Sequence, residues 1–267
     1  KEDRYQNLIK IYLTADDLEI QDLMLQAQDD YYNGSLSKAI SKYKLALKKE
    51  KNTPYINPYL LERIHKDLAS IYREKNKTKN AIKHYKESIE YNSIIDNKEN
   101  LALRNGMLAF CYSDIGDRIN FNKYLSIAQN LAYEMGDYKW CMDMSALLLG
   151  SYLGLVKYEK AINESKKYFS YAEKYGDVTS DDEIYNQYIG VLNDVIDIYL
   201  NINDYDNAIF YLDKVNAERR SIRNQNSFDI FSKKLELYEN FGMLINMNSE
   251  IEEVTDSLEY FIYQDEL

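Results

Sequence analysis

The chain has 267 residues, of which 27 are Tyr but only 9 are Gly and 2 are Pro, and its formal net charge is -11. The scarcity of Gly and Pro argues against a fold rich in turns and strands and predicts a large all-helical protein. The acidic balance disfavours direct binding to nucleic acid, and no stretch reaches the roughly 18 consecutive apolar residues of a membrane span.

The predicted elements begin with an amphipathic segment at residues 4–15, which we expect to be an N-terminal cap or the remnant of a preceding repeat. Four helices farther along open with an Ala-Ile pair: AISKYKLAL (39–47), AIKHYKESI (81–89), AINESKKYF (161–169) and AIFYLDKVN (208–216). Partner helices carrying aromatic residues lie between them, at 68–76, 107–117, 147–158 and 195–205. The recurring unit is therefore helix, short polar turn, helix.

Aligning the units on the residue that opens the second helix gives a period near 40 residues, with anchors at Ala39, Ala81, Phe121, Ala161, Ala208 and Met247. Nine residues before five of these anchors stands a tyrosine: Tyr72, Tyr112, Tyr152, Tyr199 and Tyr238. Small residues in the first helix and at the anchor let paired helices approach closely, and the tyrosine fills the cleft to the next pair. The longest interval contains the connector 176–184, within which we expect a helix to start at Ser180 or Asp181.

This pattern resembles the tetratricopeptide repeat. The resemblance implies an all-α, right-handed superhelix of about six helical hairpins, an α-α solenoid. We expect a single array over residues 1–267, divided into a cap at 1–19 and units at 20–61, 62–100, 101–138, 139–178, 179–225 and 226–267, the last with an acidic C-terminal cap. The long period and the Gly-Asp endings at 136–137 and 176–177 are similar to the extended repeats of bacterial signalling proteins, including peptide-pheromone receptors.

The resemblance also implies that the first helix of each pair lines a concave groove that holds a protein or peptide. The predicted groove residues run from basic through apolar to acidic: Arg63, Lys66, Ser70, Arg73, Leu103, Phe110, Ala146, Gly150, Leu153, Asn193, Asp197 and Asn201. Two alternatives stay open. The small residues on this wall could serve only helix packing, and the basic stretch around residues 38–90 could be a solvated face rather than a site for an acidic partner.

Catalytic signals are weak. The sequence contains no Gly-rich phosphate loop, nucleophile elbow or metal-ligand helix motif, and its only histidines are His65 and His84. We expect Cys111 and Cys141 to pack as small hydrophobic residues. The prediction is therefore a protein without enzymatic activity, metal or cofactor.

Together these features predict a protein- or peptide-binding module, the sensory or partner-recruiting region of a bacterial regulatory protein. One alternative is a structural scaffold that uses its convex face or its ends, and a more remote one is a phosphatase-type regulator. The expected partner is a protein or peptide and not nucleic acid or a membrane. Free cysteines favour the cytoplasm. The periplasm is the alternative if a leader has been removed.

Overall fold

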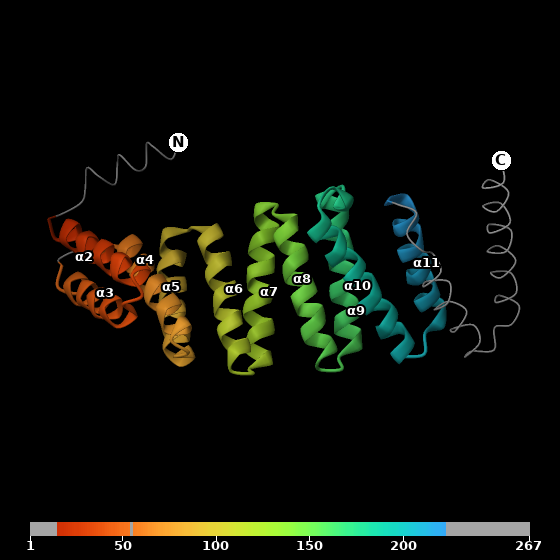
Figure 1. Ribbon diagram of the computed structural model, residues 1–267, viewed down its shortest axis with the longest axis horizontal. Helices are drawn as coiled ribbons and strands as arrows, with labels where there is room; N and C mark the ends of the chain where they lie inside the picture. Colours follow the sequence, from red (N-terminus) through yellow and green to blue (C-terminus); the bar gives the residue numbers. More distant parts are fainter. Residues whose placement is uncertain (1–14, 54–55, 223–267) are drawn as a thin grey trace, which may run out of the picture. The chain divides into compact units, whose positions relative to one another are not determined.

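The computed structural model describes residues 15–53 and 56–222, and within these ranges it contains helices and no strand. Figure 1 shows these helices following one another along the chain. Their bounds are α2 (Ala15–Tyr32), α3 (Leu36–Glu50), α4 (Pro58–Glu74), α5 (Thr78–Ile95), α6 (Lys98–Asp114), α7 (Arg118–Met135), α8 (Tyr138–Leu153), α9 (Tyr158–Tyr175), the 3-10 turn η1 (Val178–Ser180), α10 (Asp182–Asn201) and α11 (Tyr205–Ile222).

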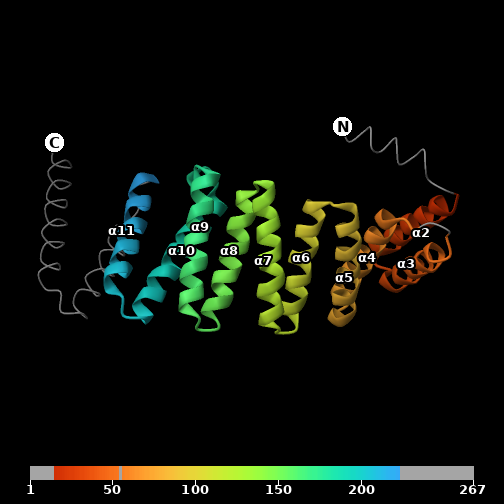
Figure 2. The same ribbon diagram turned by 180° about the vertical axis from the view of Figure 1, so that it is seen from behind.

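The chain divides into two compact units: unit 1 is Lys1–Ser151 with Lys167–Lys174, and unit 2 is Tyr152–Lys166 with Tyr175–Leu267. In unit 1, α2 packs on α3, α4 on α5 and α6 on α7, and α5 also contacts α6, as both views show (Figures 1 and 2). In unit 2, α10 packs on α11. This succession of helical hairpins confirms the predicted all-α, tetratricopeptide-like solenoid class. The predicted sixth pair (226–267) and most of the predicted N-terminal segment (4–14) lie outside the described residues.

The helices start where the sequence supplies caps. Before α4, the Asn57 side chain accepts hydrogen bonds from the backbone N–H groups of Tyr59 (3.1 Å) and Leu60 (3.3 Å), and Pro58 occupies the first helical position. Asp181 caps α10 in the same way, at one of the two positions expected from the sequence. None of the helices in the described ranges has the length and apolar character needed to cross a bilayer.

One turn geometry recurs between the helices of all five described pairs. The backbone N–H of the residue just before the second helix donates to the carbonyl five residues earlier, as in the bonds from Lys77 to the Tyr72 carbonyl (2.8 Å) and from Asp117 to the Tyr112 carbonyl (2.9 Å). This closure needs a left-handed residue at the equivalent place in each turn: Gly34, Asn76, Gly116, Val156 and Asn203, with φ between 55° and 75°. Among these five residues Val156 carries the largest conformational strain, because a β-branched side chain disfavours the left-handed conformation.

The anchor residues of the repeat form the core. Ala39, Ala81, Ala161 and Ala208 have no exposed surface, and Phe121 is 7% exposed. The alanines leave room for the partner helix, so the paired helices pack closely as the repeat predicted.

The recurring tyrosines are packed by stacking. The ring of Tyr72 stacks on His84, that of Tyr112 on Tyr124 and that of Tyr199 on Tyr211, with centroid distances of 5.4 to 5.7 Å. In each case the partner ring stands three residues after the anchor of the same unit. Within unit 1, a lysine from the preceding second helix covers the same tyrosine, Lys44 over Tyr72 and Lys86 over Tyr112.

A buried carboxylate ties three helices of unit 1 together. Oε1 of Glu62 on α4 accepts hydrogen bonds from Ser88 Oγ and Asn92 Nδ2 on α5 and from Arg104 Nε on α6, each at 3.0 Å. The side chains of Glu62 and Arg104 are only 6% and 13% exposed. A charged pair this far from water needs its full set of partners, and Glu62 supplies the anion for Arg104.

Candidate functional site

The twelve predicted groove residues all stand on first helices of pairs, and each has a side chain that is exposed or half-buried. Unit 1 holds the eight from Arg63 to Gly150, on α4, α6 and α8, while unit 2 holds Leu153, Asn193, Asp197 and Asn201. Whether they form one binding wall stays a prediction. Within unit 1, the structure brings two of them, Ser70 and Arg73, into the same hollow.

That hollow has a volume of about 830 Å³ and is built from four helices and the turn after α4. We call it the α4 pocket. It is lined by Tyr31 of α2, by Ser70, Arg73 and Glu74 of α4, by Asn76 in the turn, by Thr78 and Tyr85 of α5, and by Met107 and Asp114 of α6. Because α4 and α6 are first helices of neighbouring pairs, the pocket lies across a boundary between repeats, where an extended ligand would contact both.

Arg73 is the best-positioned charged group of the α4 pocket. Its Nε donates to Oδ2 of Asp114 at 2.9 Å, and its guanidinium carbon lies 5.8 Å from the ring centre of Phe110. The contact with Asp114 raises the pKa of the Arg73 guanidinium, so the group is charged at every accessible pH. Both side chains of the pair remain more than a third exposed. The guanidinium is therefore oriented by α6 and still reachable from solvent.

Uncharged hydrogen-bonding groups surround this arginine. Ser70 Oγ donates to the carbonyl of Lys66 (3.1 Å) and lies 3.2 Å from the Tyr85 hydroxyl, which we therefore assign as the donor to Ser70. At the other side, the Tyr31 hydroxyl donates to Glu74, and this bond raises the pKa of Tyr31. The pocket thus combines a cation, carboxylates and hydroxyls, a set that suits a peptide better than a purely apolar ligand.

The predicted basic end of the wall carries less free charge than the sequence suggests. Lys66 Nζ lies 2.6 Å from Oδ1 of Asp67, and Arg73 is paired with Asp114, so two of its three cations have a carboxylate partner. Arg63 is exposed and has no ion-pair partner among the described residues, but it lines a separate hollow of about 70 Å³ with Gln21, Met24 and Leu25. The three cations do not converge on one anion.

Helix packing does not require a glycine at one small residue of the predicted wall. A Cβ added to Gly150 on α8 would meet no heavy atom within 4 Å. A role for the small residues in ligand binding stays a prediction. In unit 2, the Asn201 amide donates to the Asp197 carbonyl (2.6 Å), which leaves its side-chain oxygen as the acceptor for a peptide N–H.

A histidine pair was missed by the sequence reasoning. His65 on α4 and His84 on α5 face each other with 3.1 Å between their Nδ1 atoms, so one ring donates and the other accepts. Burial and neighbouring lysines lower the pKa of each to about 4. The available signal was the repeat itself, because His84 occupies the place of the stacking rings Tyr124 and Tyr211. The pair lies between helices rather than in the α4 pocket.

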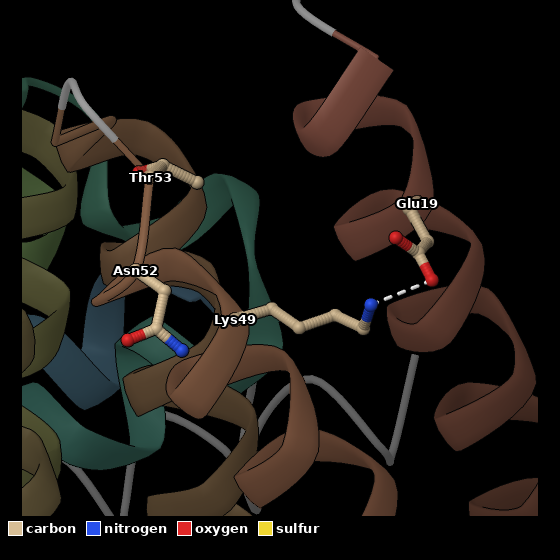
Figure 3. Close-up of a pocket in the computed structure, with 4 residues that line it drawn as sticks. All are labelled: Glu19, Lys49, Asn52 and Thr53. Atoms are coloured by element: carbon tan, nitrogen blue, oxygen red, sulfur yellow. Dashed lines mark ion pairs between the residues drawn. The ribbon is translucent and has the colours of Figure 1, made fainter.

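Two other features are candidates for a reactive site, a second hollow and the two cysteines, but an ion pair crosses the first and the second are buried in the core. A hollow of about 200 Å³ between α2 and α3 is lined by Glu19, Lys49, Asn52 and Thr53, and Figure 3 shows the Lys49–Glu19 ion pair (2.6 Å) reaching across it. Cys111 and Cys141 are fully buried free thiols, and burial raises the pKa of each to about 11. Within the described ranges, no group of three or more His, Cys, Asp or Glu could hold a metal ion.

Two of the helical pairs contain matches to a known sequence family. The sequence model described as Tetratricopeptide repeat matches residues 67–94 and 197–219, which contain the pairs Tyr72 with Ala81 and Tyr199 with Ala208. A search of curated protein sequences found no match.

Solved structures with similar folds include BtubC (BKLC) from P. vanneervenii, with a TM-score of 0.55 and 15% identity over 84% of this chain and 89% of BtubC. The apo form of RapI has a TM-score of 0.55 and 11% identity over 92% of this chain and 99% of RapI. A signal transduction ATPase with a tetratricopeptide repeat sensor, from Pyrococcus horikoshii, has a TM-score of 0.52 and 18% identity over 89% of this chain and 35% of the ATPase. At such low sequence identities, these structural matches show a shared fold and nothing about function. Together with the repeat match, they show that the chain contains tetratricopeptide repeats and has the all-helical fold of proteins built from such repeats.

Proposed function

We propose that the chain is a protein- or peptide-binding module that serves as the sensory or partner-recruiting region of a regulatory protein, and that it has no catalytic activity of its own. The observation that carries the proposal is the α4 pocket, where Ser70, Arg73 and Asp114 from two successive repeats line one hollow of about 830 Å³. The fold itself is typically an interaction scaffold. One fold relative carries such repeats as a named sensor, which supports a sensory role.

A peptide fits this pocket chemically because its backbone alternates donors and acceptors. The hydroxyls of Ser70, Tyr85 and Tyr31 already donate within the protein and offer acceptors, whereas the side chains of Asn76 and Thr78 offer both donors and acceptors. Since these groups sit on packed helices, their positions are fixed before a ligand arrives, which lowers the entropy cost of binding. The bacterial origin expected from the extended repeats remains part of the proposal.

A matched pair of variants tests whether the pocket is the binding site. Ser70 and Ser93 are both exposed helical serines whose hydroxyls donate to the carbonyl four residues earlier, at 3.1 and 2.9 Å, but only Ser70 lines the pocket. Ser70→Trp places a large ring in the pocket, whereas Ser93→Trp places the same bulk on α5 outside it. We expect peptides selected from a displayed random library on the wild-type chain to lose binding to Ser70→Trp and to keep binding to Ser93→Trp. Equal binding by both variants would refute the assignment.

The alternative is a scaffold that docks proteins through the second helices of the pairs. It is favoured by large apolar side chains there that face solvent, Ile94 on α5 (69% exposed) and Ile119 on α7 (82% exposed). Loss of partner binding in Ile94→Ser and Ile119→Ser variants, together with retained binding in Ser70→Trp, would favour this alternative over the pocket.

A further inference from the structure

Arg73 in the α4 pocket is held on one edge and open on the other. An arginine side chain has five N–H donors, and in Arg73 the Nε–H is the one engaged, by Asp114. The four N–H groups of its terminal nitrogens have no acceptor among the described residues, although the guanidinium is fixed over Phe110. The Arg73 guanidinium is therefore already oriented, and the N–H groups of its two terminal nitrogens can donate to an acceptor on a ligand.

The geometry of that free edge selects a class of ligand. Two parallel N–H bonds from one guanidinium match the two oxygens of a carboxylate, and such charge-assisted pairs are about twice as strong as neutral hydrogen bonds. Met107 stands on α6 two turns before Asp114, lines the same pocket and is 39% exposed. An exposed methionine beside a charged group offers an adaptable apolar contact to a neighbouring ligand side chain.

We propose that the α4 pocket binds a peptide through a carboxylate that pairs end-on with Arg73, with an apolar ligand side chain against Met107. This inference rests on the proposed function and adds the ligand class to it. Asp114 acts as a positioning residue, since it aims the guanidinium and does not itself contact the carboxylate. The carboxylate can come from an Asp or Glu side chain or from a peptide C-terminus, because both present the same two oxygens.

Glu74 gives the proposal a second, opposite signature. It lines the same pocket and adjoins Arg73 in sequence, so its negative charge opposes an incoming carboxylate through solvent. Removing that charge should therefore strengthen binding of a carboxylate ligand, whereas it would weaken binding of a cationic one. A pocket that selects cations would show the reverse pattern at both Arg73 and Glu74.

The first test measures ligand preference. The wild-type chain is applied to an array of N-acetylated heptapeptides synthesised in matched sets, in which one position is Glu, Gln or Lys and the C-terminus is either amidated or free. If a side chain supplies the carboxylate, amidated peptides with Glu should bind more strongly than amidated peptides with Gln. If the C-terminus supplies it, peptides with a free C-terminus should bind more strongly than the same peptides with an amidated one. In both arms, Leu, Met or Phe beside the carboxylate should increase the signal. A preference for Lys, or none between Glu and Gln and between the two termini, would overturn the inference.

The second test assigns the preference to Arg73. Binding of the best array peptide, measured by fluorescence anisotropy, should weaken at least about tenfold in Arg73→Gln, since one charge-assisted bidentate contact is lost. Arg118→Gln removes the same charge from an exposed site at the start of α7, outside the pocket, and should change affinity less than twofold. Glu74→Gln should tighten binding about two- to threefold. Equal losses in Arg73→Gln and Arg118→Gln would mean that only net charge matters and would refute the assignment.

The two proposals fail in different ways. If array peptides bind, and Ser70→Trp abolishes that binding, but carboxylate and Arg73 make no difference, the proposed function stands and the ligand class is wrong. If no peptide binds the wild-type chain, the peptide-binding function fails and this inference fails with it. Competition by millimolar inorganic phosphate as effectively as by the peptide would show a small-anion site and would also overturn the peptide assignment.

Discussion

The buried Glu62 network should contribute far more to stability than any exposed ion pair in unit 1. Glu62→Gln keeps the shape of the side chain but removes the negative charge that faces Arg104. Removing one partner of a buried pair costs about 3–5 kcal/mol, because the remaining charge is left uncompensated. Arg104 is 13% exposed and Gln retains an oxygen for Ser88 and Asn92, so we expect the lower end, about 3 kcal/mol.

The matched control is Glu134→Gln. It breaks the ion pair between Lys98 and Glu134, which is shorter (2.8 Å) but whose side chains are 52% and 53% exposed. Exposed pairs typically contribute about 0–1 kcal/mol, so this variant should be almost neutral. Urea unfolding followed by circular dichroism at 222 nm gives the free energy of unfolding for both, provided that the slopes of the transitions agree with the wild type.

A double variant separates the charge effect from simple loss of contacts. When Arg104→Gln is added to Glu62→Gln, the uncompensated charge disappears, and part of the lost stability should return. The reasoning is refuted if Glu62→Gln and Glu134→Gln differ by less than about 0.5 kcal/mol, or if the double variant is less stable than the sum of the single losses.

Three further predictions concern local features. Val156→Gly should stabilise unit 2 by about 0.5–1 kcal/mol in urea unfolding, because relief of the left-handed conformation outweighs the entropy of glycine; a destabilised variant would contradict this. His65 and His84 have folded-state pKa values of about 4, below their unfolded value, so the free energy of unfolding should fall as the pH drops from about 6.5 towards 4. The expected loss for the pair between pH 7 and pH 5 is about 2 kcal/mol after discounting for solvent screening. A His65→Phe/His84→Phe variant should lack this part of the pH dependence. Cys111 and Cys141 should resist N-ethylmaleimide at pH 7.5 in the native chain and react in urea, as counted by mass spectrometry; rapid native labelling would show that the thiols are accessible.

The repeat made the fold predictable, because close packing requires small or aromatic residues at fixed places. Ala81 and Tyr72 could be assigned to a helix interface from periodicity alone, and both are buried. The same alignment contained the stacking position of His84, but a histidine there does not by itself indicate that a second histidine will face it. That contact depends on His65 pointing across from α4, which is a matter of side-chain rotamer rather than of period.

The candidate pocket was predictable only in part for the same reason. The resemblance to the repeat family placed Ser70 and Arg73 on the inward side of a first helix, and the structure brings both into one hollow together with Asp114. The sequence pattern could not show that Arg73 and Lys66 form ion pairs with nearby carboxylates. The Arg73–Asp114 pair depends on the distance between α4 and α6, which a linear pattern does not contain, whereas the Lys66–Asp67 pair depends on the rotamers of two neighbouring side chains.

Two side-chain contacts join α4 directly to α6, and we expect the pocket to depend on the buried one. Glu62 joins α4 to α6 through Arg104, and Arg73 joins the same helices through Asp114 about 16 Å farther along α4, at 1.5 Å per residue. The first contact is buried and rigid, whereas the second is exposed and weak, so the buried pair should hold the helices where the exposed pair can form. Glu62→Gln should therefore reduce peptide affinity several-fold at a temperature where the chain is still folded, although Glu62 does not line the pocket. Anisotropy titrations of Glu62→Gln and Glu134→Gln with one array peptide measure this, and unchanged affinity in a destabilised Glu62→Gln would show that other contacts between α4 and α6 position Arg73.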